Sequence, residues 1–431
     1  MTCYCDRKDY SDSPSRSNVL DTRPGDARNS AELSTWQVIT IAAGWLVLLF
    51  VGAYLIAPAS ILTLVMDDLG VTEATAAALV SMPQVAATVI GIPVGVYLDR
   101  VQTRAVVPVA ALVLLAGSLG DWFAASEGTV SLLIASRLFA GVGMFVLWVV
   151  SINVASSTVP PDRRATATSV IISGYPAGYA LGQLGSPRLA EVVGWPGVFP
   201  VFGAAVVVLS LAFYVAVGRV SRFETSTDPM TLADFGRVVR NRDVWTVVVV
   251  TVLGYSLYMV FNSWMPTYIT SQFDVTLAES GTFVALFPAV GILARPAGGW
   301  LSDTVLAQRR RPVFAASFVG ATVLAVAMFY SATIAVLVAM LVLAGVFIQL
   351  QIGLMYQSIQ EFVDPGAAGT AVSLASVAGW LGSFVAPVVA GELVATTGTY
   401  AVLFVLAVCL GVTGTLTVWQ MAESGESAIT D

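Results

Sequence analysis

Long apolar stretches separated by short polar segments follow one another from Trp36 almost to the end of the chain. Each stretch is long enough for a helix to cross a hydrocarbon core about 30 Å thick. Because a bilayer core has no water for backbone groups to bond, each stretch is expected to be helical. We predict twelve membrane-crossing helices, at residues 36–65, 74–98, 105–125, 130–156, 165–187, 196–218, 244–268, 278–301, 312–331, 333–358, 368–391 and 399–421.

The longest polar interruption lies between the sixth and seventh apolar stretches and divides the chain into two parts of six helices each. A first polar segment precedes Trp36; it is rich in Ser, Asp, Arg and Pro and lacks the apolar run of a signal peptide. The predicted organisation is therefore a disordered cytoplasmic tail at 1–35, an N-terminal six-helix bundle at 36–218, a cytoplasmic linker at 219–243, a C-terminal six-helix bundle at 244–421 and a cytoplasmic tail at 422–431.

The basic residues predict the orientation of these helices. Of the 20 lysines and arginines, 17 fall in segments that lie on the same side as the N-terminus, and only Arg188 falls on the other side. Positively charged loops stay in the cytoplasm. We therefore expect a multi-pass plasma-membrane protein with both termini in the cytoplasm. The two remaining basic residues, Arg137 and Arg295, lie inside predicted helices.

The composition excludes several classes of protein. Charged residues make up 11% of the chain, less than half of the roughly 25% typical of a soluble domain. Histidine is absent and there are three cysteines, so a His-based catalytic group or a four-ligand zinc site is excluded. The net charge of −7 disfavours binding to nucleic acid. We expect no catalytic residues, no metal and no cofactor.

The two halves carry an internal repeat. A shift of 204 residues brings Gly95 onto Gly299 and Asp99 onto Asp303. The same shift aligns Gly141 with Gly345, Thr166-Ala167 with Thr370-Ala371, Ser169 with Ser373, Gly178 with Gly382, Leu189 with Leu393, and Gly194 with Gly398. Two six-helix halves of the same orientation are typical of a duplicated transporter, with a binding site between halves that rock against each other.

Two related loops lie at repeat-related places. They contain Gly95, Asp99, Arg100 and Arg104 in the first half, and Gly299, Asp303 and the arginines at 309–311 in the second. These loops resemble the signature loop of the major facilitator superfamily, Gly-x-Leu-x-Asp-Arg-x-Gly-Arg-Arg, although Gln102 replaces the second glycine. The resemblance implies an all-α membrane fold of two pseudo-symmetric six-helix bundles, monomeric, working by alternating access. It also implies that these loop residues control the conformational change.

The fourth predicted helix carries Arg137 and Gly141, in a run similar to the second motif of the same superfamily, Arg-x-x-x-Gly-x-Gly. Counted at 1.5 Å per residue, Arg137 lies about 12 Å below the outer edge. A charge at that depth needs polar partners or water. We expect a role in conformational gating or proton handling, with structural hydrogen bonding as the alternative.

The fifth predicted helix has glycines at every fourth position, Gly174, Gly178 and Gly182. Small residues at this spacing form one face on which two helix backbones can meet. The stripe is also similar to the glycine-rich helix of families with an antiporter signature. Close helix packing and an antiport role are both open at this point.

The eighth predicted helix contains Arg295, followed by Pro-Ala-Gly-Gly-Trp-Leu-Ser-Asp. This run looks like helix 8 of the nitrate/nitrite porter family, in which the arginine binds the anion. A guanidinium near the midplane can hold a planar anion through two parallel hydrogen bonds. That family has a second arginine, and the repeat-related position here is Gly91. The alternative for Arg295 is a side chain that reaches the inner surface or a neighbouring carbonyl.

Other polar side chains lie well inside the predicted helices and need partners there. Those placed about mid-helix are expected to bind substrate together with Arg295, namely Tyr54, Gln84, Tyr258, Asn262 and Trp380. The carboxylates all fall in the tail or near a membrane surface, and Asp121 at the outer end of the third helix is the nearest to the interior. Proton coupling through a carboxylate in the cavity is therefore not expected.

Together these features predict a secondary transporter that moves a small organic or inorganic anion. A multidrug or metabolite efflux antiporter is the first alternative, and a membrane ligand sensor that does not transport is the second. The expected partners are a small-molecule substrate and the lipid bilayer, and an enzyme is not expected.

Overall fold

A computed structural model describes residues 33–98, 103–159, 164–220, 232–306, 309–363 and 368–421. Every regular element in these ranges is helical, as predicted. The elements are α2 (Thr35–Ser60), α3 (Leu62–Leu69), α4 (Glu73–Leu98), α5 (Thr103–Ser126), α6 (Val130–Thr158), α7 (Arg164–Ile172), α8 (Gly174–Val217), α9 (Leu232–Arg240), α10 (Arg242–Gln272), α11 (Leu277–Ala289), α12 (Gly291–Trp300), the π-helical turn η2 (Leu301–Val305), α13 (Arg311–Phe329), α14 (Ile334–Gln360), α15 (Ala368–Thr397) and α16 (Ala401–Trp419).

The helix α8 crosses the membrane twice. At 1.5 Å per residue its 44 residues would be about 66 Å long if straight, twice the thickness of a hydrocarbon core. The chain folds back at Gly194, which has a φ of 73° inside the helix. A positive φ favours glycine. The 11 apolar helical spans of the described residues therefore make twelve crossings, as predicted, with the bend between the expected helices 165–187 and 196–218.

Three predicted helices are interrupted where the structure describes them. The stretch predicted at 36–65 breaks at Ile61 into α2 and α3, three residues after Pro58, whose ring nitrogen has no proton to donate. The stretch predicted at 278–301 breaks at Val290, two residues after Pro288, and ends in the π turn η2. The stretch predicted at 165–187 breaks at Ser173. Apolar length predicts the crossing but not these breaks.

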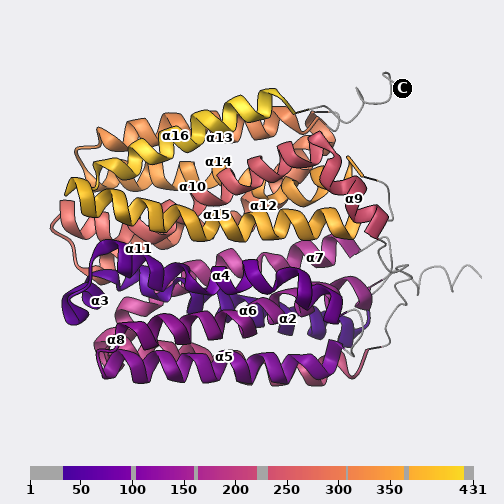
Figure 1. Cartoon of the computed structure of the whole chain (residues 1–431), viewed down its shortest axis with the longest axis horizontal. Helices are drawn as coiled ribbons and strands as arrows, with labels where there is room; N and C mark the ends of the chain where they lie inside the picture. Colours follow the sequence, from indigo (N-terminus) through magenta and orange to yellow (C-terminus); the bar gives the residue numbers. More distant parts are fainter. Residues whose placement is uncertain are drawn as a thin grey trace, which may run out of the picture. The chain divides into compact units, whose positions relative to one another are not determined.

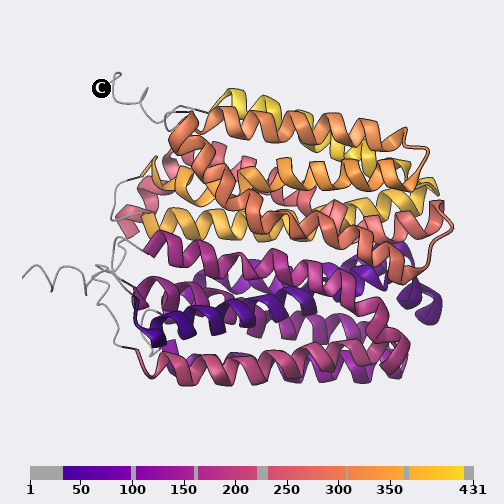
Figure 2. The same cartoon turned by 180° about the vertical axis from the view of Figure 1, so that it is seen from behind.

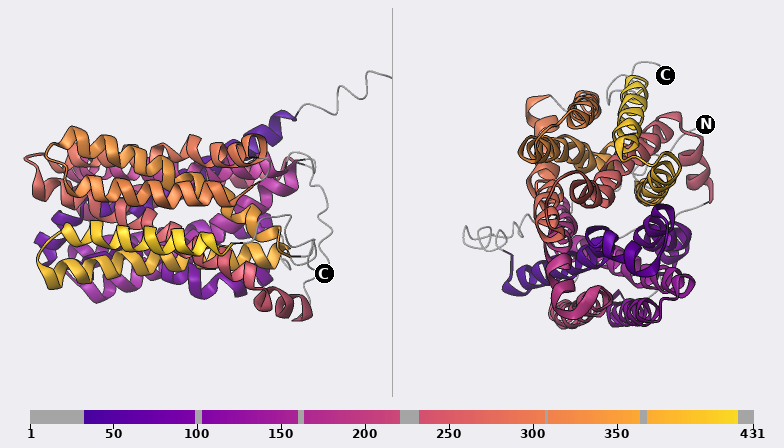
Figure 3. Two further views of the ribbon diagram at one scale, coloured as in Figure 1. Left: turned by 90° about the horizontal axis from the view of Figure 1, so that it is seen from above. Right: turned by 90° about the vertical axis from the view of Figure 1, so that its left-hand side faces the viewer.

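Two bundles of helices lie side by side, each made by consecutive parts of the chain (Figures 1 and 2). The helices up to α8 form one bundle and those from α10 onward form the other, as the end-on view shows (Figure 3). The predicted fold of two six-helix bundles is confirmed. In the sequence, the predicted linker at 219–243 joins the two bundles and contains the short helix α9. Residues 221–231 and the predicted tail at 422–431 lie outside the described ranges, as does most of the predicted tail at 1–35.

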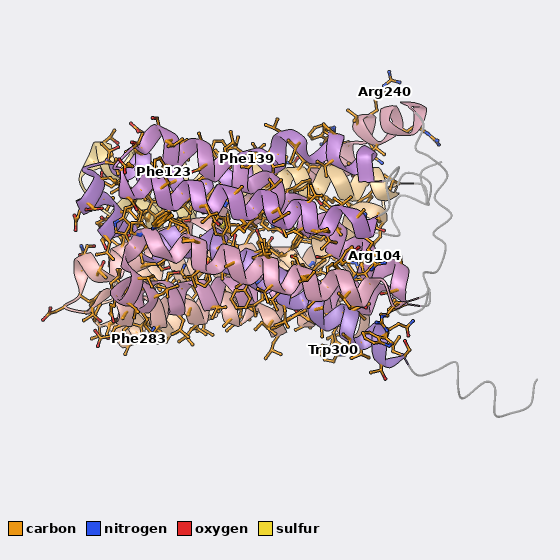
Figure 4. All side chains as sticks on the ribbon, turned by 90° about the horizontal axis from the view of Figure 1, so that it is seen from below. Arg104, Phe123, Phe139, Arg240, Phe283 and Trp300 are labelled. Carbon is orange, nitrogen blue, oxygen red and sulfur yellow. The ribbon has the colours of Figure 1, made fainter. Side chains whose placement is uncertain are left out.

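Arg104 and Arg240, which the charge count assigns to the cytoplasm, lie toward the same end of the helices (Figure 4). We call this the predicted cytoplasmic end and the opposite one the predicted outer end. Phe123 and Phe139 are about half exposed along the sides of the bundle (Figure 4). Exposed aromatic side chains on the sides of membrane-crossing helices suit contact with lipid.

The glycine stripe of the fifth crossing packs against the first. A Cβ on Gly178 would lie closer than 3.0 Å to the backbone oxygen of Leu49, and one on Gly182 would lie 2.8 Å from that of Ala53. The second half repeats this arrangement, with Gly382 against the backbone oxygen of Val252. Close backbone packing explains the stripe without an antiport role.

Candidate functional site

A cavity lies between the two bundles, and both contribute to its wall. Its described lining residues are Trp148 from α6, Tyr175 and Tyr179 from α8, Tyr255 and Tyr258 from α10, Arg295 from α12, Tyr356 from α14, and Ser376, Gly379, Trp380 and Ser383 from α15. Arg295 is the one charged group among them. A positive charge in a largely aromatic wall, with no lining carboxylate, suits an anionic ligand.

Arg295 is held by a neutral amide. Its Nε donates to Gln349 Oε1 at 3.1 Å, and the side chain is 9% exposed. No described hydrogen bond or ion pair uses its two terminal nitrogens. Those are the two donors that a guanidinium offers side by side to a planar anion. The arginine therefore enters the cavity with its charge uncompensated by any described side chain.

Aromatic rings continue from Arg295 across to the other bundle. The guanidinium carbon lies 5.6 Å from the ring centre of Tyr258, within the range of a cation–π contact. Tyr258 stacks on Tyr179 of the first bundle, with ring centres 5.6 Å apart and planes 20° apart. The buried Tyr258 hydroxyl lies near Arg295 and Asn262 but makes no well-formed hydrogen bond with either. An anion oxygen at this point could accept from both the hydroxyl and the guanidinium.

The bundles also meet beyond the cavity, toward the predicted outer end. Gln183 Nε2 donates to the backbone oxygen of Asn262 at 2.7 Å. Arg188 Nη2 donates to Thr282 Oγ1 at 2.8 Å, also from one bundle to the other. A Cβ on Gly391 of α15 would approach the backbone oxygen of Glu73 to 2.9 Å. These contacts separate the cavity from the predicted outer end.

The six residues predicted to bind substrate divide into two groups. Arg295, Tyr258 and Trp380 line the cavity. Asn262 lies one helical turn beyond Tyr258, and its amide donates to the Tyr258 backbone oxygen at 2.8 Å. Gln84 and Tyr54 are fully buried and are not among the lining residues. The structure therefore brings together about half of the predicted set.

Tyr54 belongs instead to a buried polar cluster inside the first bundle. Its hydroxyl donates to Asp121 Oδ2, which lies 3.7 Å from Arg137 Nη1. The Asp121 Oδ1 accepts from the hydroxyl of Ser136 at 2.6 Å. Asp121 and Arg137 are 0% exposed. Asp121 lies near the end of α5, as expected, but it is buried inside the bundle as the counter-ion of Arg137.

Arg137 also satisfies backbone oxygens of two neighbouring helices. Its Nε donates to the Leu79 oxygen at 3.0 Å and its Nη2 to the Leu55 oxygen at 3.1 Å. In a regular helix the Leu79 oxygen would bond to the N–H four residues on, but that residue is Pro83, which has none. Arg137 therefore donates to an oxygen that the helix itself leaves without a donor. This contact supports structural hydrogen bonding, the alternative role given above for this motif.

Comparison with known proteins identifies the family. Residues 43–387 match the Major Facilitator Superfamily. The chain belongs to this superfamily. Similar curated proteins include the probable nitrate/nitrite transporter NarK2 of Mycobacterium tuberculosis, 27% identical over 75% of this chain and 81% of that protein. The nitrite extrusion protein of Bacillus subtilis is 24% identical over 85% of this chain and 88% of its own.

Solved structures of other transporters share this fold. A bacterial homolog to the human lysosomal transporter Spinster, in its inward-facing and occupied conformation, has a TM-score of 0.75 at 16% identity and covers 90% of this chain and 97% of that one. The D-xylose-proton symporter has a TM-score of 0.71 at 15% identity, over 90% and 98% of the two chains.

The superfamily loop of the first half is described only in part. Asp99 and Arg100 lie outside the described residues, and Gly95 lies near the end of α4. Arg104 donates from Nε to the Tyr214 oxygen at 3.3 Å. Its guanidinium carbon also lies 4.3 Å from the Tyr214 ring centre. This arginine ties α5 to the end of α8 within one bundle.

The repeated loop of the second half follows the π turn η2, which contains Asp303. Arg310 forms an ion pair with Glu361 at the end of α14, with Nη2 and Oε1 2.9 Å apart, and it donates to Ser302 Oγ at 2.8 Å. A Cβ on Gly299 would meet no atom within 4 Å, whereas one on Gly298 would lie closer than 3.0 Å to a backbone oxygen of α14. Close packing here requires Gly298, not the motif glycine.

The glycine of the second motif does pack closely. A Cβ on Gly141 would lie 2.6 Å from the backbone of Pro83. In the second half, a Cβ on Gly345 would lie 2.7 Å from the oxygen of Phe287. The shift of 204 residues relates both members of these pairs, so the repeat seen in the sequence is also a repeated contact.

Proposed function

We propose that this superfamily member carries a small anion across the plasma membrane, with Arg295 as the anchor. The main support is that Arg295 is the one charged group among the described lining residues and that no described carboxylate pairs with it. Placing an uncompensated charge at this depth is costly. A bound anion offsets that cost, which supports a site that is filled during transport.

The similar proteins support an anion as the substrate. NarK2 is named as a probable nitrate/nitrite transporter, and a 27% identical rice protein is named as a probable anion transporter. This chain differs from the nitrate/nitrite pattern at Gly91, where that pattern has its second arginine. With one arginine in the cavity, we propose that the substrate is a singly charged anion. The proposal covers this class of anion and does not single out nitrate.

The proposed cycle is alternating access by the bundles at 36–218 and 244–421. The bridges Gln183 to Asn262 and Arg188 to Thr282 support a state closed toward the outside. We propose that these bridges break when the cavity opens outward, and that the loop residues around Asp99 and Asp303 control the opposite end. The termini and the linker with α9 are proposed to face the cytoplasm.

Substitution of Arg295 tests the proposal. Anion uptake and solid-supported membrane currents would be recorded in proteoliposomes with nitrate, nitrite, formate and acetate. We expect Arg295→Gln to abolish the response to the transported anion. Arg295→Lys should keep the charge but lower the response about tenfold or more, because an ammonium cannot form the two parallel hydrogen bonds.

The matched control is Arg240→Gln, which removes an exposed arginine from α9 and should leave the response unchanged. If the wild type responds to none of the four anions, or if both Arg295 variants transport as the wild type does, the proposal is wrong.

The same cavity predicts how transport depends on protons. No described lining residue is a carboxylate, and Asp121 is engaged by Arg137 outside the lining. We therefore expect equal initial uptake with and without a pH gradient at fixed membrane potential. Dissipating the gradient with a protonophore provides the control, and a strict requirement for an inward proton gradient would contradict this expectation.

Efflux of larger aromatic compounds is a second candidate, which the ring wall of Trp148, Tyr175 and Trp380 favours. Two of its ring pairs, Trp148 with Tyr175 and Trp148 with Trp380, have centres 5.0 and 6.1 Å apart. In this case expression would raise resistance to such compounds in growing cells, and Arg295→Gln would leave that resistance intact.

A further inference from the structure

In each bundle a buried arginine lies over a tyrosine ring, and the two tyrosines are related by the repeat. Arg137 lies 4.8 Å from the ring centre of Tyr54, and Arg295 lies 5.6 Å from that of Tyr258. A shift of 204 residues takes Tyr54 onto Tyr258. The two arginines differ in their side-chain partners: Arg137 pairs with a carboxylate, whereas Arg295 donates to an amide oxygen. This difference determines what each arginine can bind.

In the first bundle the partner of the arginine is a carboxylate. Asp121 neutralises Arg137 and also accepts from the hydroxyls of Tyr54 and Ser136. The remaining polar contacts of Arg137 go to backbone oxygens. A ligand anion would have to displace a resident carboxylate, so this arginine is a structural element.

In the second bundle the partner is Gln349, and its orientation follows from its own contacts. The Nε2 of Gln349 donates to the backbone oxygens of Phe287 at 3.0 Å and Pro288 at 3.2 Å. Because oxygens can accept only from the NH₂ end of an amide, the Oε1 end must face Arg295. A Cβ on Gly291 would overlap this amide, so the side chain is also confined by packing.

The first bundle has uncharged residues at the positions that the repeat relates to Arg295 and Gln349. Shifting back by 204 residues takes Arg295 onto Gly91 and Gln349 onto Phe145. A Cβ on Gly91 would lie 3.5 Å from Phe145 Cζ, so the two positions are also neighbours in the first bundle. There the pair is apolar. The donor and its oriented acceptor are therefore present on one side of the cavity only.

We propose that Gln349 determines the charge selectivity of the cavity. It holds the guanidinium by Nε, so that the terminal nitrogens remain available, and it does so without neutralising it. This inference rests on the proposed anion site at Arg295 and extends it to a residue that does not line the cavity. A carboxylate in this place would compensate Arg295 internally, as Asp121 compensates Arg137, and the cavity would no longer retain an anion.

The test compares two substitutions of nearly equal size. Gln349→Glu adds the compensating charge, whereas Gln349→Met removes the acceptor without adding a charge. Uptake would be measured with whichever of nitrate, nitrite, formate and acetate gives the largest wild-type response. At about pH 7.5 we expect Gln349→Glu to raise KM at least tenfold more than Gln349→Met, since a hydrogen-bonded charge pair changes binding by about this factor or more.

Two further measurements separate charge selectivity from a folding defect. Acidification that protonates the new carboxyl should partly restore the Gln349→Glu variant relative to the wild type at the same pH, because a protonated carboxyl is neutral and can again donate to a backbone oxygen. Gln351→Glu is the matched control: Gln351 is equally buried, two residues further along α14, lies beside Gly254 and has no described hydrogen bond to Arg295. The Gln351→Glu variant should have a lower unfolding temperature, but its KM for the anion should not rise as that of Gln349→Glu does.

The inference is overturned if Gln349→Glu keeps the wild-type KM while Arg295→Gln is inactive, since the anion site would then exist without this control. It is also overturned if Gln349→Met is impaired as much as Gln349→Glu, with no recovery on acidification. If Arg295→Gln itself transports normally, the proposed function fails first, and the two failures are distinguishable.

Discussion

Replacing Asp121 with alanine is expected to lower the free energy of unfolding by about 3–5 kcal/mol, because a buried ion pair loses one partner while the other keeps its charge. Arg137 would remain 0% exposed without its carboxylate. The hydroxyls of Tyr54 and Ser136 would lose their acceptor as well. The measurement is reversible unfolding of the purified protein in mixed micelles, followed by tryptophan fluorescence.

Two further variants identify the cause. Asp121→Asn keeps an acceptor oxygen for the hydroxyls but removes the charge, so its destabilisation should be smaller than that of Asp121→Ala. Asp67→Asn makes the same chemical change at an exposed position of α3 and should leave the unfolding midpoint unchanged. If Asp121→Ala unfolds at the same midpoint as this control, the buried pair does not stabilise the bundle.

The sequence could predict the crossings because their length and apolar character are properties of the chain alone. The two loops indicated the family, which the match over residues 43–387 confirms, whereas the orientation from charge placement stays a prediction. Depth along a helix could also be estimated, and Asp121 does lie near the end of α5. The side of the helix that a residue occupies could not be estimated, because these helices are apolar nearly all round. For that reason the sequence does not predict that Asp121 faces Arg137, or that Tyr54 joins them instead of lining the cavity.

The same limit explains the candidate site. Arg295 could be found because a single charge inside an apolar run stands out. Trp148, Tyr175 and Tyr356 also line the cavity, but nothing in their spacing distinguishes them from aromatic residues in lipid or in a core. Gln349 could be noticed as a polar residue within a helix. Its bond to Arg295, however, joins α12 to α14 across 54 positions of sequence and requires the fold.

Replacing Gly353 with alanine is expected to impair both stability and transport. Gly353 of α14 packs against the backbone of Arg295, and a Cβ there would lie closer than 3.0 Å to the Arg295 backbone oxygen. Backbone cannot yield as a flexible side chain can, so α12 must move away from α14. Overpacking of this kind costs about 1–3 kcal/mol. The movement would also stretch the 3.1 Å bond from Arg295 to Gln349, and KM for the transported anion should rise.

The matched control is Gly299→Ala, on the same helix as Arg295 but with open space around the added methyl. Alanine is the better helix former by about 1 kcal/mol, so this variant should be as stable as the wild type or more so. The comparison separates a glycine that is part of a family motif from one that packing requires. Unfolding midpoints and KM are measured for both variants. Equal effects of the two substitutions would show that the α12–α14 contact does not position Arg295, whereas an effect confined to Gly353→Ala would show that it does.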